Sequence, residues 1–144
     1  MKSFQWIAKL SKDDISQIFE CLGDGDAKRV KRKDREIVAK YFSQKWIGYG
    51  WWDSQLIGYC FIKHPNKRPE TLTVVRSDYR NKGIATKLRN FAINAREFKG
   101  HIIYSAVKLD NPASFKSIIK SGFVVFDITK DRYVQLMKVL PYEK

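Results

Sequence analysis

The feature that most constrains the fold is a change of hydrophobic period between residues 71 and 97. Thr71–Arg76 is a run of β-favouring residues, whereas Gly83–Glu97 carries apolar residues at helical spacing. The apolar face of that helix consists of Ile84, Leu88, Phe91, Ala92 and Ala95. The sequence therefore predicts a strand that turns sharply into an amphipathic helix, a unit of folds in which helices cover a sheet.

The start of this predicted helix is suited to an anion. A helix N-terminus presents unpaired backbone N–H groups and the positive end of the helix dipole. Gly83 and Ala85 leave room for an anion to approach those groups, and Arg80 and Lys82 add positive charge. The segment matches neither a Walker A loop nor a G-x-G-x-x-G fingerprint. We therefore predict a phosphate or pyrophosphate site at this turn.

The remaining periodicities extend this unit to a complete order of elements. Strands are predicted over residues 3–8, 46–52, 56–63, 71–76, 102–107, 123–128 and 133–140, and helices over 11–22, 28–42, 83–97 and 111–121. The order is β-α-α-β-β-β-α-β-α-β-β, which predicts an α+β (mixed α/β) fold in one domain, residues 1–144. We expect a mostly antiparallel mixed sheet of about seven strands with helices on both faces. The β-α-β units at 71–107 and 102–128 are each expected to pair in parallel.

Composition excludes several classes of protein. The 28 Lys and Arg residues against 15 Asp and Glu give a net charge of +13, which favours anionic ligands or partners. Cys21 and Cys60 are the only cysteines, so a disulfide framework and a structural zinc site are not expected. With only two histidines we expect no metal centre. No apolar run suits a membrane span or a secretory signal, and we expect a cytoplasmic protein.

Two motifs resemble those of the GNAT superfamily of N-acetyltransferases. Residues 80–85, Arg-Asn-Lys-Gly-Ile-Ala, match the family's R/Q-x-x-G-x-G/A at a strand-to-helix junction. Residues 111–123 match a second motif, roughly N-x-x-A/S-x-x-x-Y-x-K-x-G-F, at Asn111, Ser114, Lys120, Gly122 and Phe123. The predicted order of elements along the chain is also similar to that fold. The resemblance implies acetyl-CoA as co-substrate.

The resemblance also implies which residues hold acetyl-CoA. The pyrophosphate would be bound at Arg80, Asn81, Lys82, Gly83, Ile84, Ala85 and Thr86, mainly by backbone amides. Val74 and Val75 would meet the pantetheine arm through their backbone, and the Val75 amide would polarise the thioester carbonyl. Asn111 and Ser114 would contact the pantetheine side. Strands 71–76 and 102–107 are expected to splay apart and open a slot.

The groups that move protons are less well defined by the sequence. The family commonly has a tyrosine that protonates the leaving thiolate, but Ile118 stands at that position and suits a helix core. Another group or water would then serve; the candidates are Tyr59, Cys60, Tyr104 and Ser105. For the general base, Glu70 precedes the 71–76 strand where the family often has a glutamate. Water is the alternative base, ahead of His64 and Asp53.

Two further segments each allow two interpretations. Residues 46–52, Trp-Ile-Gly-Tyr-Gly-Trp-Trp, are either sheet core or a wall of the acceptor pocket in which glycines make room for ligand. The basic run 28–35 is either a solvated helix face or a docking site for an acidic protein or tRNA. Its basic residues are Lys28, Arg29, Lys31, Arg32, Lys33 and Arg35.

The resemblance predicts an enzyme that transfers an acetyl group from acetyl-CoA to a primary amine by direct attack in a ternary complex. The alternatives are an acetyltransferase of toxin or modifier type directed at tRNA or protein, and a non-catalytic binding module of this fold. The acceptor is an amine-bearing small molecule or macromolecule, with no membrane partner. The protein is expected to be a monomer or a homodimer, in which the last strand, 133–140, could pair with another copy.

Overall fold

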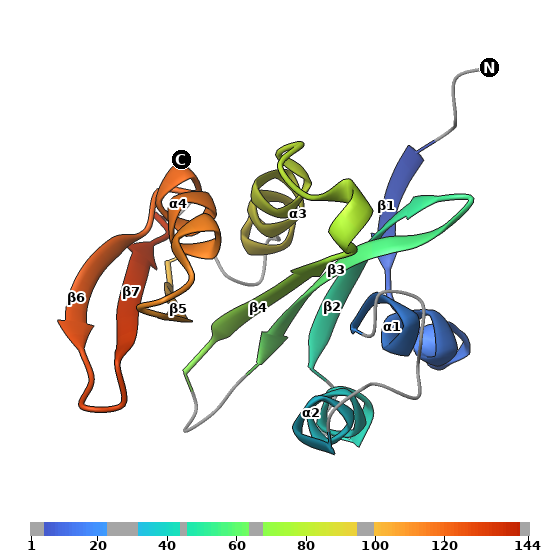
Figure 1. Cartoon of the computed structure of the whole chain (residues 1–144), viewed down its shortest axis with the longest axis horizontal. Helices are drawn as coiled ribbons and strands as arrows, with labels where there is room; N and C mark the ends of the chain where they lie inside the picture. Colours follow the sequence, from blue (N-terminus) through green and yellow to red (C-terminus); the bar gives the residue numbers. More distant parts are fainter. Residues whose placement is uncertain (1–4, 23–31, 44–45, 64–67, 95–99, 142–144) are drawn as a thin grey trace.

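The computed structural model describes residues 5–22, 32–43, 46–63, 68–94 and 100–141. These residues form a seven-stranded sheet with two pairs of helices (Figure 1). The elements are β1 (Gln5–Lys9), α1 (Ile15–Leu22), α2 (Arg32–Ser43), β2 (Ile47–Asp53), β3 (Gln55–Lys63), β4 (Glu70–Val75), α3 (Ile84–Ile93), β5 (Ile102–Lys108), α4 (Pro112–Lys120), β6 (Val124–Ile128) and β7 (Tyr133–Val139). The mixed α/β class and the order of elements are as the sequence predicts.

The sheet opens between its two central strands. Its order is β1-β2-β3-β4-β5-β7-β6, and every neighbouring pair is antiparallel except β4 and β5. These two run in parallel because α3 carries the chain back between them. Their pairing is confined to Glu70 opposite Tyr104, at the start of β4. Toward Val75 the two strands have no paired residues, which agrees with the expected splay.

Helices cover both faces of the sheet, as predicted. On one face α1 and α2 pack on a core that includes Trp46, Trp52 and Phe61 (Figure 1). On the other face α3 and α4 pack on a core that includes Leu88 and Ile118. Alternation along β2 supplies both cores, because successive side chains of a strand point to opposite faces.

One predicted pairing is wrong. The strand at 124–128 does not pair with β5, because β7 lies between them and pairs with both. Val134 and Leu136 of β7 are buried, whereas every residue of β6 is exposed. The strand with the apolar alternation therefore occupies the interior place, and β6 forms the edge. The last strand consequently has no free edge for a second copy.

Several element boundaries also differ from prediction. A short 3-10 turn, Ser77–Tyr79, follows β4, and α3 begins at Ile84. Phe91 is exposed and packs its ring edge against Tyr49 instead of joining the helix core. Within the described part of the chain no helix combines the length and apolar character needed to cross a bilayer.

Candidate functional site

The turn between β4 and α3 leaves a helix N-terminus open. Asn81 and Gly83 adopt left-handed backbone angles, φ 63° and 78°, which let the chain reverse within a few residues. The first helical hydrogen bond runs from the Lys87 N–H to the Gly83 carbonyl, at 3.1 Å. The N–H groups of residues 84–86 therefore precede the helical ladder. A Cβ built on Gly83 meets no atom within 4 Å, so the space in front of the helix is clear.

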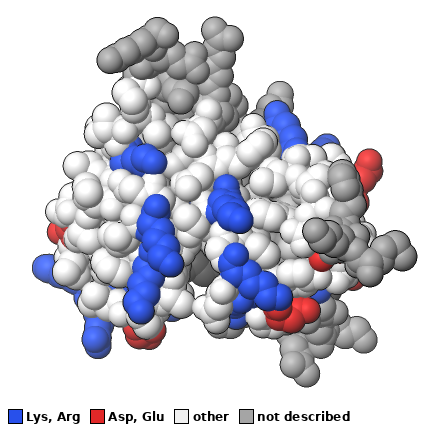
Figure 2. Space-filling model, turned by 90° about the horizontal axis from the view of Figure 1, so that it is seen from above, with Lys and Arg blue, Asp and Glu red and all other residues white. Residues whose placement is uncertain are grey.

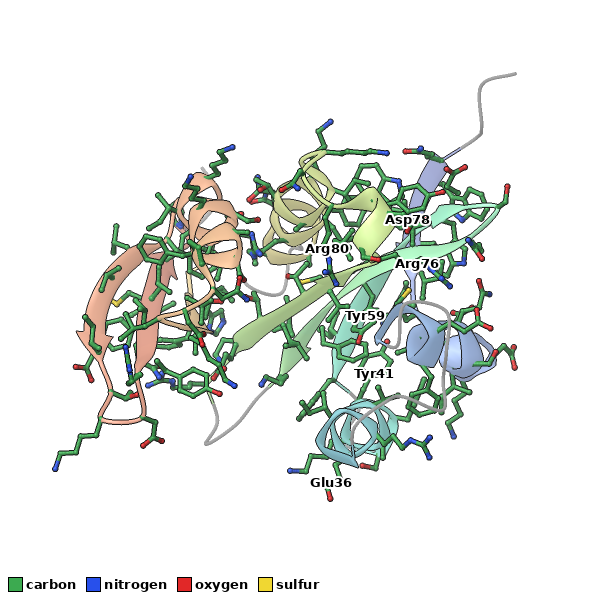
Figure 3. The ribbon with its side chains drawn as sticks, in the orientation of Figure 1. Glu36, Tyr41, Tyr59, Arg76, Asp78 and Arg80 are labelled. Atoms are coloured by element: carbon green, nitrogen blue, oxygen red, sulfur yellow. The ribbon has the colours of Figure 1, made fainter. Side chains whose placement is uncertain are left out.

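Side chains hold this turn against the sheet. Arg80 folds back so that its Nε donates to the Val75 carbonyl at 3.0 Å, and Figure 3 shows it beside the end of β4. The Tyr79 hydroxyl donates to the Asp53 carboxylate at 3.2 Å, and Lys82 lies over the Tyr79 ring. Asp53 therefore anchors the turn to the β2–β3 hairpin.

Arg76 turns the opposite way from Arg80, toward α1 (Figure 3). It is buried, donates to the Leu56 carbonyl at 2.8 Å and forms an ion pair with Glu20 at 3.2 Å. This arginine joins α1 to the end of β4.

A cavity of about 810 Å³ lies between β4, the turn and helices α3 and α4. Residues of β4, of the turn and of both helices line it: Thr73, Val74, Val75, Tyr79, Arg80, Asn81, Gly83, Ile84, Ala85, Thr86, Arg89, Asn111, Pro112, Ala113, Ser114, Lys116, Ser117 and Lys120. Four of these are cations, and none is acidic. The lining favours an anionic ligand.

Basic side chains also gather around this side of the molecule. Figure 2 looks from above onto the face that carries α3, α4 and the β4–α3 turn, and Lys and Arg side chains gather over it. The acidic side chains in that view lie toward its margins.

The backbone of β4 faces the opening with alternate N–H groups. The Arg76 N–H points toward β3, since it donates to the Ile57 carbonyl at 2.8 Å. Successive peptide groups of a strand point to opposite sides, so the N–H groups of Val75 and Thr73 point toward β5. The ladder with β5 does not extend to these two residues. They present a pair of amides to the splayed side of β4.

Helix α4 forms the opposite wall. The Asn111 side chain caps it by accepting from the Ser114 N–H at 3.2 Å, and Pro112 occupies the first helical turn. The cap thus fixes the N-terminus of α4 beside the cavity, with Asn111 and Ser114 in its lining.

A hydrogen-bonded network joins the two helices behind the cavity. Arg89 on α3 is 3% exposed, and its Nη1 donates to the hydroxyls of Ser117 and Ser121 on α4, both at 3.0 Å. The Ser117 hydroxyl is also 3.0 Å from that of Thr86. Burial lowers the pKa of the Arg89 guanidinium. It is a cation, because the guanidinium of an arginine is not deprotonated in proteins.

Most of the residues predicted to hold acetyl-CoA lie together. Of the predicted set, every residue except Lys82 lines the cavity. Glu70, predicted as the base, lies elsewhere: it stands at the closed end of the β4–β5 opening and pairs with Lys63 at 3.7 Å. Glu70 is five positions before Val75 in the strand, a distance of roughly 16 Å along its axis.

Ile118, which stands at the position of the family's tyrosine, does not line the cavity. Ile118 is 3% exposed and packs in the core beneath α4. The other suggested acids also lie outside the lining. Burial raises the pKa of the Cys60 thiol, Ser105 is hydrogen-bonded to Thr71, and the Tyr104 ring lies under Arg68. Tyr59 is buried in the opposite core.

The glycines of β2 make room for aromatic rings. A Cβ on Gly48 would stand 2.8 Å from ring atoms of Tyr41 and Phe61. One on Gly50 would stand 2.5 Å from Leu56 and 2.7 Å from Trp52. The structure therefore supports the core interpretation of residues 46–52. Lys28, Arg29, Lys31 and His64 fall outside the described residues. The other three basic residues of the run lie on α2, where Arg35 is exposed.

Sequence reasoning missed two notable lining residues, Thr73 and Arg89. Nothing in the sequence marks Thr73 as a site residue apart from its place in a predicted strand. Arg89 did carry one, since it is a charged residue directly after Leu88 in the apolar stripe of a helix. A cation at such a position requires polar partners inside the fold.

Comparison with known proteins identifies the family. The family model described as "Acetyltransferase (GNAT) family" matches residues 13–123. The chain belongs to the GNAT acetyltransferase family. No curated protein sequence matches the chain.

Solved GNAT-like structures share its fold. A GNAT-family acetyltransferase from Bacillus cereus superposes with a TM-score of 0.78 at 15% identity, covering 95% of this chain and 98% of that one. The PaiA N-acetyltransferase of Thermoplasma acidophilum, in complex with coenzyme A, gives 0.75 at 22% identity over 94% and 99%. An alanine N-acetyltransferase of a ribosomal protein from Escherichia coli gives 0.73 at 14% identity over 98% and 96%.

Proposed function

We propose that this GNAT protein is an acetyl-CoA-dependent N-acetyltransferase that acts on a primary amine by direct attack in a ternary complex. The observation that carries the proposal is the cationic cavity of about 810 Å³ between β4, the β4–α3 turn and helices α3 and α4. The cavity combines an open helix N-terminus with the alternate amides of β4. A negatively charged ligand with a long polar arm suits both parts.

The residues present fit acetyl-CoA. The N–H groups at the start of α3 would hold the pyrophosphate, with Arg80 beside them and the bare Cα of Gly83 allowing close approach. The backbone of β4 from Thr73 to Val75 would border the pantetheine arm as a strand partner would, and the Val75 amide is kept for the thioester carbonyl. Asn111 and Ser114 would border the arm from α4. Acetyl-CoA supplies a thioester whose carbonyl carbon the amine attacks.

The chain's main contribution to the reaction is a positioned backbone amide. Attack places negative charge on the carbonyl oxygen, and a fixed N–H from β4, which we assign to Val75, would stabilise that charge by about 3 kcal/mol. We assign removal of the amine proton to water, because Glu70 lies roughly 16 Å from Val75 along the strand. Glu70 would then receive the proton only through intervening water.

The acceptor is assigned only as a primary amine. The ribosomal-protein acetyltransferase of the same fold acts on an alanine of a protein. A protein amine is therefore a reasonable first class to screen for this chain, beside small amines and tRNA-linked amines.

A thermal melt with and without saturating acetyl-CoA tests the proposal. A ligand at a hundredfold its Kd stabilises the native state by about 2.7 kcal/mol. That energy corresponds to a rise in Tm of about 5–10 °C for a domain of this size. ADP, which lacks the pantetheine arm, should give a smaller rise.

Release of CoA that depends on an added amine would then establish catalysis. No rise in Tm with acetyl-CoA would contradict the cofactor assignment. A rise without acceptor-dependent release of CoA across the amines screened would favour the binding-module alternative.

A further inference from the structure

Arg89 is a buried cation that the proposed function has not yet used. It lies in the second turn of α3, is 3% exposed and lines the cavity. The other cations of the lining, Arg80, Lys116 and Lys120, are exposed. Water and salt screen an exposed charge strongly and a buried charge far less. Of the four lining cations, Arg89 is therefore the one whose charge acts on a bound anion with the least screening.

The guanidinium of Arg89 is tied to α4 by two serines. Its Nη1 donates to the Ser117 hydroxyl and to the Ser121 hydroxyl, both at 3.0 Å. This nitrogen carries two hydrogens, so both are used, and an arginine can only donate. Both serine oxygens therefore accept from Arg89, and each serine keeps its own hydroxyl proton for another partner.

The hydroxyls of the two serines have different further partners. Ser121 donates to the Ser117 carbonyl at 3.4 Å, so its hydrogen bond stays within the C-terminal turn of α4. The Ser117 hydroxyl oxygen lies 3.0 Å from the hydroxyl oxygen of Thr86 on α3, and both residues line the cavity. Ser117 therefore connects the buried guanidinium to the first turn of α3, and Ser121 does not.

A count of protons shows that this chain of hydrogen bonds ends in a donor. Ser117 and Thr86 carry one hydroxyl proton each, and the hydrogen bond between them uses one of the two. Because Arg89 supplies its own hydrogen to Ser117, one hydroxyl proton has no acceptor among the described residues. When Ser117 donates to Thr86, that proton belongs to Thr86 and is available to a ligand in the cavity.

Thr86 stands in the part of the cavity assigned to the pyrophosphate. It is the third residue of α3 and lies three residues beyond Gly83, which is about 4.5 Å along the helix axis. Its N–H is one of those that precede the helical ladder, and its hydroxyl faces α4, where Ser117 lies. A phosphate oxygen on the α4 side of the helix terminus would be within reach of that hydroxyl.

The charge of Arg89 has no counter-ion in the described structure. Its bonded partners there are neutral hydroxyls, no ion pair with a carboxylate is formed, and its Nε has no hydrogen-bond partner. A buried cation without an anion is costly, and a ligand that brings negative charge offsets that cost. A diphosphate in front of α3 would bring its charge to the end of the hydroxyl chain.

We propose that Arg89 is a positioning residue for the diphosphate of acetyl-CoA and acts on it through Ser117 and Thr86. This inference rests on the proposed function. Arg89 donates to Ser117, Ser117 donates to Thr86, and the Thr86 hydroxyl donates to a phosphate oxygen. The cation at the head of the chain polarises both hydroxyls and fixes their direction, which strengthens the last hydrogen bond. Every proton stays on its own oxygen or nitrogen.

The test is calorimetric titration with three ligands that share a diphosphate. They are acetyl-CoA, acetyl-dephospho-CoA, which lacks the ribose 3′-phosphate, and ADP, which lacks the pantetheine arm. Thr86→Val removes the hydroxyl and keeps the side-chain shape and the N–H. We expect it to raise the Kd of all three ligands by about tenfold to a hundredfold, the usual effect of losing a hydrogen bond to a charged group.

The two serines provide a matched pair of variants. Ser117→Ala and Ser121→Ala each remove one hydroxyl that accepts from Arg89 and one link between α3 and α4. Ser117→Ala interrupts the chain and should raise the Kd of all three ligands by about fivefold, because the Thr86 hydroxyl then acts as an ordinary neutral donor. Ser121→Ala leaves the chain intact and should change the Kd far less. A merely structural role of Arg89 would make the two variants alike.

Arg89→Met should raise the Kd as Ser117→Ala does. Combined with Thr86→Val, it should add much less than its separate effect, because without the Thr86 hydroxyl the chain no longer reaches the ligand. If Arg89→Met does not fold, Ser117→Ala combined with Thr86→Val makes the same comparison.

The outcomes separate this inference from the proposed function. Unchanged affinity in Thr86→Val, or equal losses in Ser117→Ala and Ser121→Ala, overturns the role of Arg89 and leaves the cofactor site standing. A loss confined to acetyl-CoA would place Thr86 at the 3′-phosphate, and a loss that spares ADP would place it at the pantetheine arm; either result overturns the inference. Failure of acetyl-CoA to bind the wild-type protein overturns the proposed function as well.

Discussion

At the scale of single residues, the glycine at position 83 leaves the start of α3 open to a ligand. Its φ of 78° lies where residues with a Cβ are strained, and the space its Cβ would enter is clear of protein atoms. A side chain there would occupy the place assigned to the pyrophosphate.

Gly83→Glu should weaken acetyl-CoA binding by more than about a hundredfold, because it sets a carboxylate against phosphate, a contact that costs several kcal/mol. Calorimetric titration measures the change. Gly83→Ala carries the backbone strain alone and should weaken binding far less. Lys87→Glu changes the charge at an exposed position outside the cavity and should do the same. Equal losses in the three variants would place the phosphates elsewhere.

Ile118 is the second residue whose surroundings limit what it can do. Ile118→Tyr adds volume and a hydroxyl to a core site that is 3% exposed, and should cost roughly 1–3 kcal/mol of stability. Urea unfolding measures that loss. We also expect no gain in turnover, since residue 118 packs in the core and does not line the cavity. A several-fold faster variant would show that a missing acid limits the reaction.

At the scale of elements, α2 is fixed to the sheet by Tyr41. Its ring stacks on Phe61, with centroids 4.4 Å apart, and its hydroxyl donates to the Leu10 carbonyl at 3.0 Å. Burial, together with the charge of Asp14 and the neighbouring Tyr49, raises the pKa of Tyr41 from 10.0 to about 12. The helix therefore depends on a phenol that stays protonated.

This shift predicts an alkaline loss of stability. In the unfolded chain Tyr41 releases its proton near pH 10.0, and in the folded protein near about 12, so the unfolded state binds fewer protons between these values. The contribution of Tyr41 is complete below pH 10.0 and falls as the pH rises toward about 12. Urea midpoints of the wild type and Tyr41→Phe should converge across this window. Parallel curves would contradict the assignment.

At the scale of the whole molecule, the net positive charge and the cationic cavity both favour anionic partners. The chain carries a net charge of +13. Its cavity has no acidic side chain among the lining residues that the structure describes. Such a surface attracts polyanions regardless of whether they are substrates. Binding of tRNA therefore has to be judged by its salt dependence and by the residues it uses.

We expect tRNA to bind with an affinity that falls steeply with salt. Changing Lys28, Lys31 and Lys33 to Gln should reduce the slope of log K against log salt by about 2–3, if the basic run makes these phosphate contacts. Filter binding over a salt series measures it. The control changes three exposed lysines elsewhere, Lys87, Lys108 and Lys130, with the same loss of charge. Equal effects would assign the binding to net charge, and absent binding would remove tRNA as an acceptor.

Local patterns were sufficient to predict the helices and strands and to place residues on two walls of the site. Alternation in 46–52 and helical spacing after Gly83 report burial on one face, which is a property of neighbouring residues. The small residues after Arg80 predicted the open helix N-terminus, because they too are a feature of neighbouring residues in the sequence. The second motif placed Asn111 and Ser114 on the opposite wall, and the cap at Asn111 is a local interaction.

Which strands and side chains meet depends on the packing of the whole chain. Strand pairing depends on contacts between distant segments, so the sequence did not reveal that β7 enters between β5 and β6. Glu70 and Val75 share one strand, yet only the sheet opening sets them at opposite ends of the cleft. The guanidinium of Arg89 is oriented by serines 28 and 32 residues away along the chain. The helices, the strands and the open helix terminus follow from local spacing in the sequence, whereas the cavity and its buried cation depend on how distant segments pack.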